Sequence, residues 1–127
     1  MRTVLDTSVL LGPEPAPING DLAISAASLA ELHFGVLVAR PDDIRAERLR
    51  RLAEIERSFD PLPMDTRVAR AYGRLAAATA KAGRQPRARV MDLVIAATAM
   101  AHGARLCTRN PADLAGLEDL LEITTIE

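Results

Sequence analysis

Four carboxylates in this sequence are candidates for chemistry because of the residues that surround them. Asp6 interrupts the apolar run VLDTSVLL, and Asp92 stands in the equally apolar stretch VMDLVIAATAM. A carboxylate that is dry and unpaired in such surroundings is costly, so each must lie at the end of an element or bind a partner. Glu31 in SLAEL and Asp113 in TRNPADL complete the set.

Each acid also has an ordinary structural interpretation. Asp6 fits a turn or the N-cap of a helix, and Glu31 fits the reciprocal position of a capping box that opens with Ser28. Asp92 and Asp113 fit first-turn acids, which interact favourably with a helix dipole. These interpretations suffice for any one acid alone. They are weaker for the set, because the surroundings of Asp6 and Asp92 are too apolar for surface caps.

Short apolar strands alternate with longer helical patterns along the chain. This alternation is typical of α/β architecture, with a parallel sheet covered by helices on both faces. We expect a loop over Gly12–Gly20, which is rich in Pro and Gly, and a short extended piece over Asp60–Met64. The expected strands are Arg2–Leu5, Leu22–Ser25, Arg105–Thr108 and Glu122–Ile126. The expected helices are Ser28 to near Pro41, Asp42–Arg57, Thr66–Ala82 capped by Asp65, Val90–His102, and a turn over Pro111–Leu114.

In such a fold the right-handed crossovers bring strand C-termini and helix N-termini to one edge of the sheet. We therefore expect all four carboxylates at that edge. Two carboxylates about 4 Å apart repel by roughly 4 kcal/mol at an effective dielectric of about 20, so the cluster needs a cation. Oxygen ligands select Mg²⁺ or Mn²⁺ rather than zinc. Such sites commonly direct water against a phosphodiester, and hydrolysis is the simplest chemistry to expect.

Composition narrows the class of protein further. The length of 127 residues predicts one domain over 1–127. The formal charge of -1 excludes an overall basic field, so any nucleic-acid contact must come from local Arg clusters. Few aromatic residues exclude a base-stacking platform. The single cysteine, Cys107, excludes an internal disulfide. Without a run long enough for a membrane span or a signal peptide, we expect a cytoplasmic protein with no membrane partner.

Three segments, LDTSVLL, SLAEL and MDLVIAATAMAHGARLCTRNPADL, together resemble the PIN-domain family, and in size the chain resembles the VapC-type toxins of bacterial toxin-antitoxin pairs. The resemblance implies an α/β/α sandwich with a central parallel sheet of four to five strands. It implies RNA cleavage that depends on Mg²⁺ or Mn²⁺, a homodimer, and neutralisation by a cognate antitoxin. It places the catalytic and metal-binding acids at Asp6, Glu31 and Asp92, with Asp113 as the fourth.

The sequence departs from the family pattern in two places. The family often has an acid where this chain has Asn110, so the fourth position is divided between Asn110 and Asp113. The helix that usually follows the first strand is replaced by GPEPAPING, which we expect to alter the dimer surface or the substrate groove. Two rival functions follow: a DNA nuclease or phosphatase with the same acids, or a degenerate domain that binds RNA or a protein without cleavage.

Several other polar residues have two interpretations each. Thr7, Ser8 and Thr108 either support the acids or a metal-bound water, or are plain turn residues. The basic turn with Arg84, Arg87 and Arg89 either contacts RNA phosphates or is simply solvated. We expect His33, His102 and Cys107 to be structural. The helix Asp42–Arg57 carries an apolar stripe that consists of Ile44, Leu49, Leu52 and Ile55. This stripe either receives an antitoxin helix or packs on the chain's own core.

Overall fold

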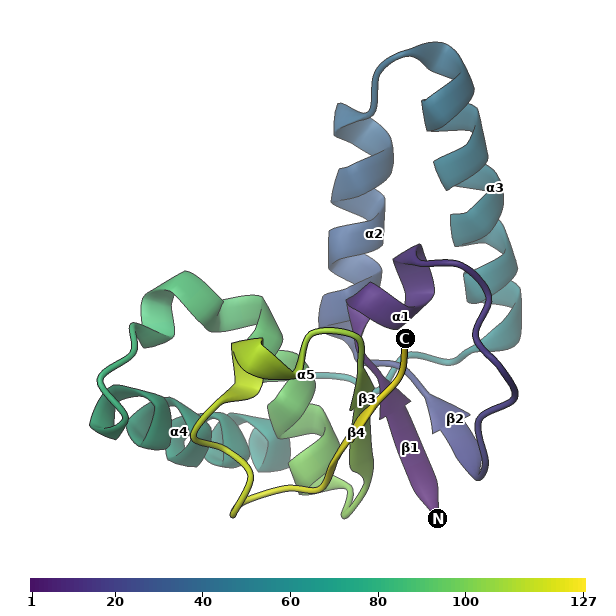
Figure 1. Cartoon of the computed structure of the whole chain (residues 1–127). Coiled ribbons are helices and arrows are strands. Elements are labelled where there is room, and N and C mark those ends of the chain that lie inside the picture. Colours follow the sequence, from purple (N-terminus) through teal and green to yellow (C-terminus); the bar gives the residue numbers. More distant parts are fainter.

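The computed structural model describes residues 1–127 and is built around a four-stranded parallel sheet (Figure 1). The strands follow the spatial order β2-β1-β3-β4. This confirms the expected α/β class with a parallel sheet, at the lower end of the expected four to five strands. The strands are β1 (Arg2–Leu5), β2 (Asp21–Ala23), β3 (Arg105–Thr108) and β4 (Ile123–Thr125).

Helices cover both faces of the sheet. Side chains alternate along the two central strands: Val4 and Leu106 join the core on one face, and Leu5 and Cys107 join the core on the other. Helices α4 and α5 cover the first face, and α1, α2 and α3 cover the second, which gives three layers (Figure 1). The helices are α1 (Thr7–Leu11), α2 (Ala26–Val38), α3 (Asp42–Ser58), α4 (Thr66–Lys81) and α5 (Val90–Ala101), with 3₁₀ turns η1 (Pro86–Arg89) and η2 (Pro111–Leu114).

Helix α2 begins earlier than the sequence predicted. Its N-cap is Ser25, whose hydroxyl accepts a hydrogen bond of 3.1 Å from the backbone N–H of Ala27. The prediction that Ser28 opens the helix was wrong, because β2 already ends at Ala23 and Ser25 is the last extended residue with a capping hydroxyl. The expected second strand over Leu22–Ser25 is correspondingly displaced. Ser25 instead forms an isolated parallel bridge with Leu62, from the predicted extended piece.

The other helix starts follow the prediction closely. Asp65 caps α4, since its carboxylate accepts a hydrogen bond of 3.0 Å from the N–H of Val68. Gly83 follows α4 with φ of +81°, a conformation that glycine adopts without steric cost. No helix of the structure combines the length and apolar character that a membrane crossing requires.

The segment after β1 keeps a short helix. The prediction that GPEPAPING replaces this helix was wrong, since Thr7–Leu11 are helical and the Gly12–Gly20 loop comes afterwards. Glycines stand at both ends of the loop, where a Cβ would meet close neighbours. A Cβ on Gly20, whose φ is +98°, would lie 2.1 Å from the carbonyl oxygen of Met1, and a Cβ on Gly12 would lie 2.6 Å from Nε of Arg109.

Candidate active site

Asp6 lies at the carboxyl end of β1 and is held there from two directions. Its backbone N–H donates to the carbonyl of Cys107 in β3 at 2.9 Å. Its carboxylate oxygen Oδ2 accepts hydrogen bonds from the hydroxyls of Ser8 at 2.8 Å and Thr108 at 2.7 Å. Asp6 occupies the N-cap position of α1, but its side chain caps no backbone N–H. A capping role therefore does not explain this carboxylate.

The two hydroxyls that bind Asp6 are themselves oriented by the backbone. Ser8 Oγ accepts from the N–H of Arg109 at 3.0 Å, and Thr108 Oγ1 accepts from the N–H of Asn110 at 3.0 Å. Each hydroxyl uses its lone pair for the backbone, so its own proton is available for the carboxylate. The orientation of Asp6 is thus set by the loop that follows β3.

Glu31 lies in the second turn of α2 and not in the first, because the helix begins at Ala26. The capping-box interpretation of Glu31 was therefore wrong. The buried hydroxyl of Thr7 donates to Glu31 Oε1 at 2.7 Å and also lies 2.9 Å from Oγ of Ser28, which is buried too. Thr7 consequently supports Glu31, while its neighbour Ser8 supports Asp6.

Asp92 occupies the first turn of α5, and the other three acids affect the pKa of its carboxyl. Burial raises the pKa of its carboxyl, and the negative charges of Asp6, Asp113 and Glu31 raise it further, against a smaller opposing effect of Arg89. Asp6 follows β1, its neighbour Thr7 binds Glu31, and the charges of the other three acids all act on Asp92.

Asp113 and Asn110 contribute to this edge in different ways. Asp113 is half exposed, and its Oδ1 lies 3.6 Å from a guanidinium nitrogen of Arg89. Asn110 takes part through its backbone N–H, which orients Thr108. Of the two candidates for the fourth position, Asp113 is the one whose charge acts on Asp92.

The basic turn before α5 is largely occupied by intramolecular contacts. Arg84 donates to the carbonyl of Ala112 at 2.9 Å, and Arg89 donates to the carbonyl of Asp113 at 3.0 Å. Both side chains thereby hold η2 beside α5. Arg87 is exposed and makes no hydrogen bond or ion pair with the chain, so it alone of the three is unoccupied.

Sequence reasoning missed two supporting residues, Ser28 and Arg109. Ser28 had a capping interpretation that hid its buried contact with Thr7. Arg109 stands beside Thr108, and its guanidinium donates to the carbonyls of Pro13, at 2.6 Å, and Glu127. No sequence signal pointed to Arg109, whose guanidinium lies where a Cβ on Gly12 would be.

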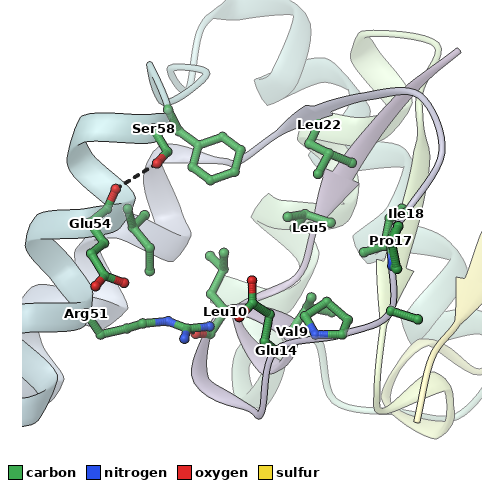
Figure 2. Close-up of a pocket in the computed structure, with 14 residues that line it drawn as sticks. Leu5, Val9, Leu10, Glu14, Pro17, Ile18, Leu22, Arg51, Glu54 and Ser58 are labelled. Carbon is green, nitrogen blue, oxygen red and sulfur yellow. Dashed lines mark hydrogen bonds between the residues drawn. The ribbon is translucent and has the colours of Figure 1, made fainter.

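Two hollows border α1. One, of about 460 Å³, lies between α1, α2 and α3 and is lined in part by Arg48, Arg51 and one acid of the cluster, Glu31. The other, of about 350 Å³, lies beneath the Gly12–Gly20 loop and contains no acid of the cluster. Figure 2 shows this second hollow, with Leu5, Leu10 and Leu22 toward its interior and Arg51 across from the loop.

The donor set suits a hard divalent cation in its chemistry, since four carboxylates supply only oxygen ligands. Burial first, and then the charges of the other three carboxylates, raise the pKa of Asp92, and a bound cation would relieve both effects. The side chains do not yet converge as ligands: no three His, Cys, Asp or Glu groups are arranged to hold a metal ion.

The PIN domain family model matches residues 3–115, a span that contains every acid described above. The chain belongs to the PIN-domain family. Among proteins of known function it is 37% identical to Ribonuclease VapC5 of Mycobacterium tuberculosis, over 97% of this chain and 93% of that protein. It is 33% identical to Ribonuclease VapC4 of the same organism, over 97% and 96% of the two chains.

Solved structures agree with this assignment. A member of the VapBC family of toxin-antitoxin systems, VapBC-5 from Mycobacterium tuberculosis, superposes with a TM-score of 0.85 and 36% identity, over 99% of this chain and 98% of that chain. FitAcB from Neisseria gonorrhoeae superposes with a TM-score of 0.75 and 26% identity, over 96% of each chain. The expected α/β/α sandwich of the PIN family is confirmed.

Proposed function

We propose that this protein is a metal-dependent endoribonuclease and the toxin of a type II toxin-antitoxin pair. The observation that carries the proposal is the coupling of Asp92 to Asp6, Glu31 and Asp113 at the carboxyl edge of the sheet. The similarity to Ribonuclease VapC5 supports RNA as the substrate. Such an enzyme would act in the cytoplasm, where its RNA substrates are.

Within this proposal Asp6, Glu31 and Asp92 hold the metal, and Asp113 completes its shell or positions the attacking water. Bound Mg²⁺ or Mn²⁺ would supply charge neutralisation at the phosphate and lower the pKa of a bound water. The chain's own contribution is positioning. Ser8 and Thr108 fix one oxygen of Asp6, Thr7 fixes one oxygen of Glu31, and the other oxygens of both carboxylates remain without hydrogen bonds.

An antitoxin partner is supported by the similarity to VapBC-5 and by apolar surface on the projecting hairpin of α2 and α3 (Figure 1). Only part of the proposed docking stripe on α3 is exposed in the structure. Leu52 and Ile55 pack in the chain's own core, whereas Ile44 and Leu49 are 41% and 55% exposed. Helix α2 adds three exposed apolar side chains near its end: Phe34, Leu37 and Val38.

We therefore propose that an antitoxin helix covers the outer part of the α2–α3 hairpin. The hollow of about 460 Å³ between α1, α2 and α3 includes Glu31 in its lining. An Arg or Lys of the antitoxin placed there would replace the charge of the metal and inhibit directly. We also expect a homodimer, which light scattering of the purified protein measures.

The decisive experiment is expression with and without the neighbouring gene. Wild type alone should arrest growth, Asp92→Ala should not, and co-expression of a neighbouring small protein should rescue the wild type and co-purify with both. Purified wild type should cleave RNA with Mn²⁺ and leave single-stranded DNA intact. Harmless wild type that cuts no RNA would favour the degenerate binding domain, and cleavage of DNA alone would favour the DNA nuclease.

A further inference from the structure

Helix α4 carries four cations and no acidic residue. Arg67, Arg70, Arg74 and Lys81 are all exposed, and none of the sixteen residues of the helix is Asp or Glu. Each residue turns an α-helix by about 100°, so these four side chains leave the helix within an arc of about 60°. They form one continuous row, which we call the α4 stripe. It lies on the flank of the helix, beside the buried row that includes Val68 and faces the core.

The cations of the α4 stripe form no ion pair with a carboxylate. The ion pairs of the structure lie elsewhere, on α3, where Arg50 binds Glu47 and Glu54, and at the pairs His33 with Glu56 and Arg89 with Asp113. Helix α3 also contains five Arg residues, but it contains five acids with them. A chain whose formal net charge is -1 thus concentrates unbalanced positive charge on one helix.

Two guanidinium groups meet at the start of the stripe. Arg2 and Arg67 lie 3.3 and 3.4 Å from the same atom, Nδ1 of His102. Burial lowers the pKa of His102, and the charges of Arg67 and Arg2 lower it further, against a smaller opposing effect of Asp65. Asp65, the cap of α4, is the acid whose charge reaches this end of the stripe, so two guanidinium groups face one carboxylate there.

The surface beside the stripe is hollowed. A depression of about 220 Å³ lies between α4 and the end of α5, so three of the cations border a concave surface with an apolar floor. The residues that line it are Arg67, Arg70, Ala71, Arg74, Met100 and Ala101.

The stripe also has a direction. From Arg67 to Lys81 it extends about 21 Å along the helix axis. The chain then turns at Gly83 and passes through η1, with the unoccupied Arg87, into the helix that carries Asp92. Figure 1 shows α4 beside α5, with η1 returning toward the sheet. The C-terminal end of the stripe therefore lies beside η1, which leads into the helix that carries Asp92.

We propose that the α4 stripe is a binding surface for the sugar-phosphate backbone of an RNA strand that continues to the acid edge. Arginines clustered along one helix face are the electrostatic footprint of nucleic-acid binding, and backbone contacts position a strand without reading its sequence. The inference rests on the proposed function only in taking RNA as the polyanion. It explains how a protein with no overall basic field would hold a long substrate.

The test measures binding in EDTA, so that its outcome is independent of cleavage. The probe is a fluorescein-labelled single-stranded RNA long enough to cover α4, and fluorescence anisotropy gives Kd as a function of KCl concentration. The triple variant Arg67→Gln, Arg70→Gln, Arg74→Gln is compared with wild type. A matched control makes the same charge change on α3: Arg45→Gln, Arg50→Gln, Arg57→Gln. Gln maintains helix propensity in both, and thermal unfolding verifies the fold.

The α4 triple variant should bind RNA roughly tenfold more weakly, and the slope of log K against log salt should fall by about 2, because each single-strand phosphate contact contributes about 0.7. The α3 control should change little. Equal losses of RNA affinity in the two variants would show that only net charge matters and would overturn the proposal. No loss of affinity in either variant would overturn it as well. Competition by poly-glutamate as effective as that by RNA would assign the stripe to an acidic protein instead. Absence of cleavage with Mn²⁺ would contradict the proposed function and leave this binding result intact.

Discussion

Thr108 donates a hydrogen bond of 2.7 Å to the carboxylate of Asp6, across 102 residues of sequence, and so joins the ends of β3 and β1 at the candidate active site. Thr108 is also buried, and it accepts the backbone N–H of Asn110. One hydroxyl thus links the orientation of an acid to the conformation of the loop that carries Asp113.

Thr108→Val should reveal this link. It preserves side-chain shape but leaves the N–H of Asn110 without its acceptor and Asp6 with one donor fewer. We expect a loss of about 1 to 3 kcal/mol in the free energy of unfolding, measured by urea denaturation. RNA cleavage should fall roughly tenfold as Asp6 loses its orientation. Thr108→Ser should retain most of the stability and most of the RNA cleavage. A serine variant as impaired as the valine variant would show that the methyl group, not the hydroxyl, matters.

Divalent metal should stabilise the fold. Binding to the folded state alone adds RT ln(1 + [L]/Kd), about 2.7 kcal/mol at one hundred times Kd, so Mn²⁺ or Mg²⁺ should raise Tm in a thermal scan. Asp6→Asn should relieve repulsion in metal-free protein and abolish the increase. Wild type whose Tm is indifferent to millimolar metal would count against the metal site.

The pKa of Asp92 predicts how stability depends on pH in EDTA. The pKa of this carboxyl is raised in the folded state. The stability that its protonated form contributes is therefore fully present below the unfolded-state pKa and is lost as pH rises through the folded-state pKa. Asp92→Asn should therefore have a higher Tm than wild type at pH 7, and the difference should shrink toward pH values below about 4, near the ordinary pKa of an aspartate side chain. A variant less stable than wild type at pH 7 without metal would contradict this coupling.

The fourth position can be assigned by comparing Asp113 with Asn110. Because the charge of Asp113 acts on Asp92 while Asn110 contributes only its backbone N–H, Asp113→Ala should lower cleavage by roughly 100-fold or more, as for loss of one preorganised charge at a reacting centre. Asn110→Ala should cost much less. Small and equal losses in kcat/KM would leave a site of three acids.

Gly12 should be intolerant of a methyl group. A Cβ there would lie 2.6 Å from Nε of Arg109, whose guanidinium is held by the carbonyls of Pro13 and Glu127. We expect Gly12→Ala to lower the free energy of unfolding by about 1 to 3 kcal/mol. Gly35→Ala in α2 is the matched control, since its nearest neighbour would be 3.9 Å away and alanine favours a helix by roughly 0.5 to 1 kcal/mol. Equal changes in the free energy of unfolding for Gly12→Ala and Gly35→Ala would show that the position of the Arg109 side chain does not matter for stability.

Much of this protein follows from local sequence. Strand β1, helices α3 and α5, and the cap of α4 by Asp65 were predicted because hydrophobic periodicity and capping chemistry act within a few residues. The expectation that the four acids share one edge also came from the sequence, because parallel strands with right-handed crossovers leave little choice of topology.

Tertiary structure decided which groups meet. Two serines, Ser25 and Ser28, had the chemistry to cap α2, and the end of β2 selected Ser25 and left Ser28 to contact Thr7. The sequence offered Thr7, Ser8 and Thr108 as supports for the acids or as plain turn residues; Ser8 binds Asp6 locally, and the pairing of β1 with β3 brought Thr108 to the same carboxylate. Thr7 went to α2 and Glu31 instead. Hydrogen bonds act over about 3 Å, so partners distant in sequence are chosen only when strand register and helix packing bring them within that distance.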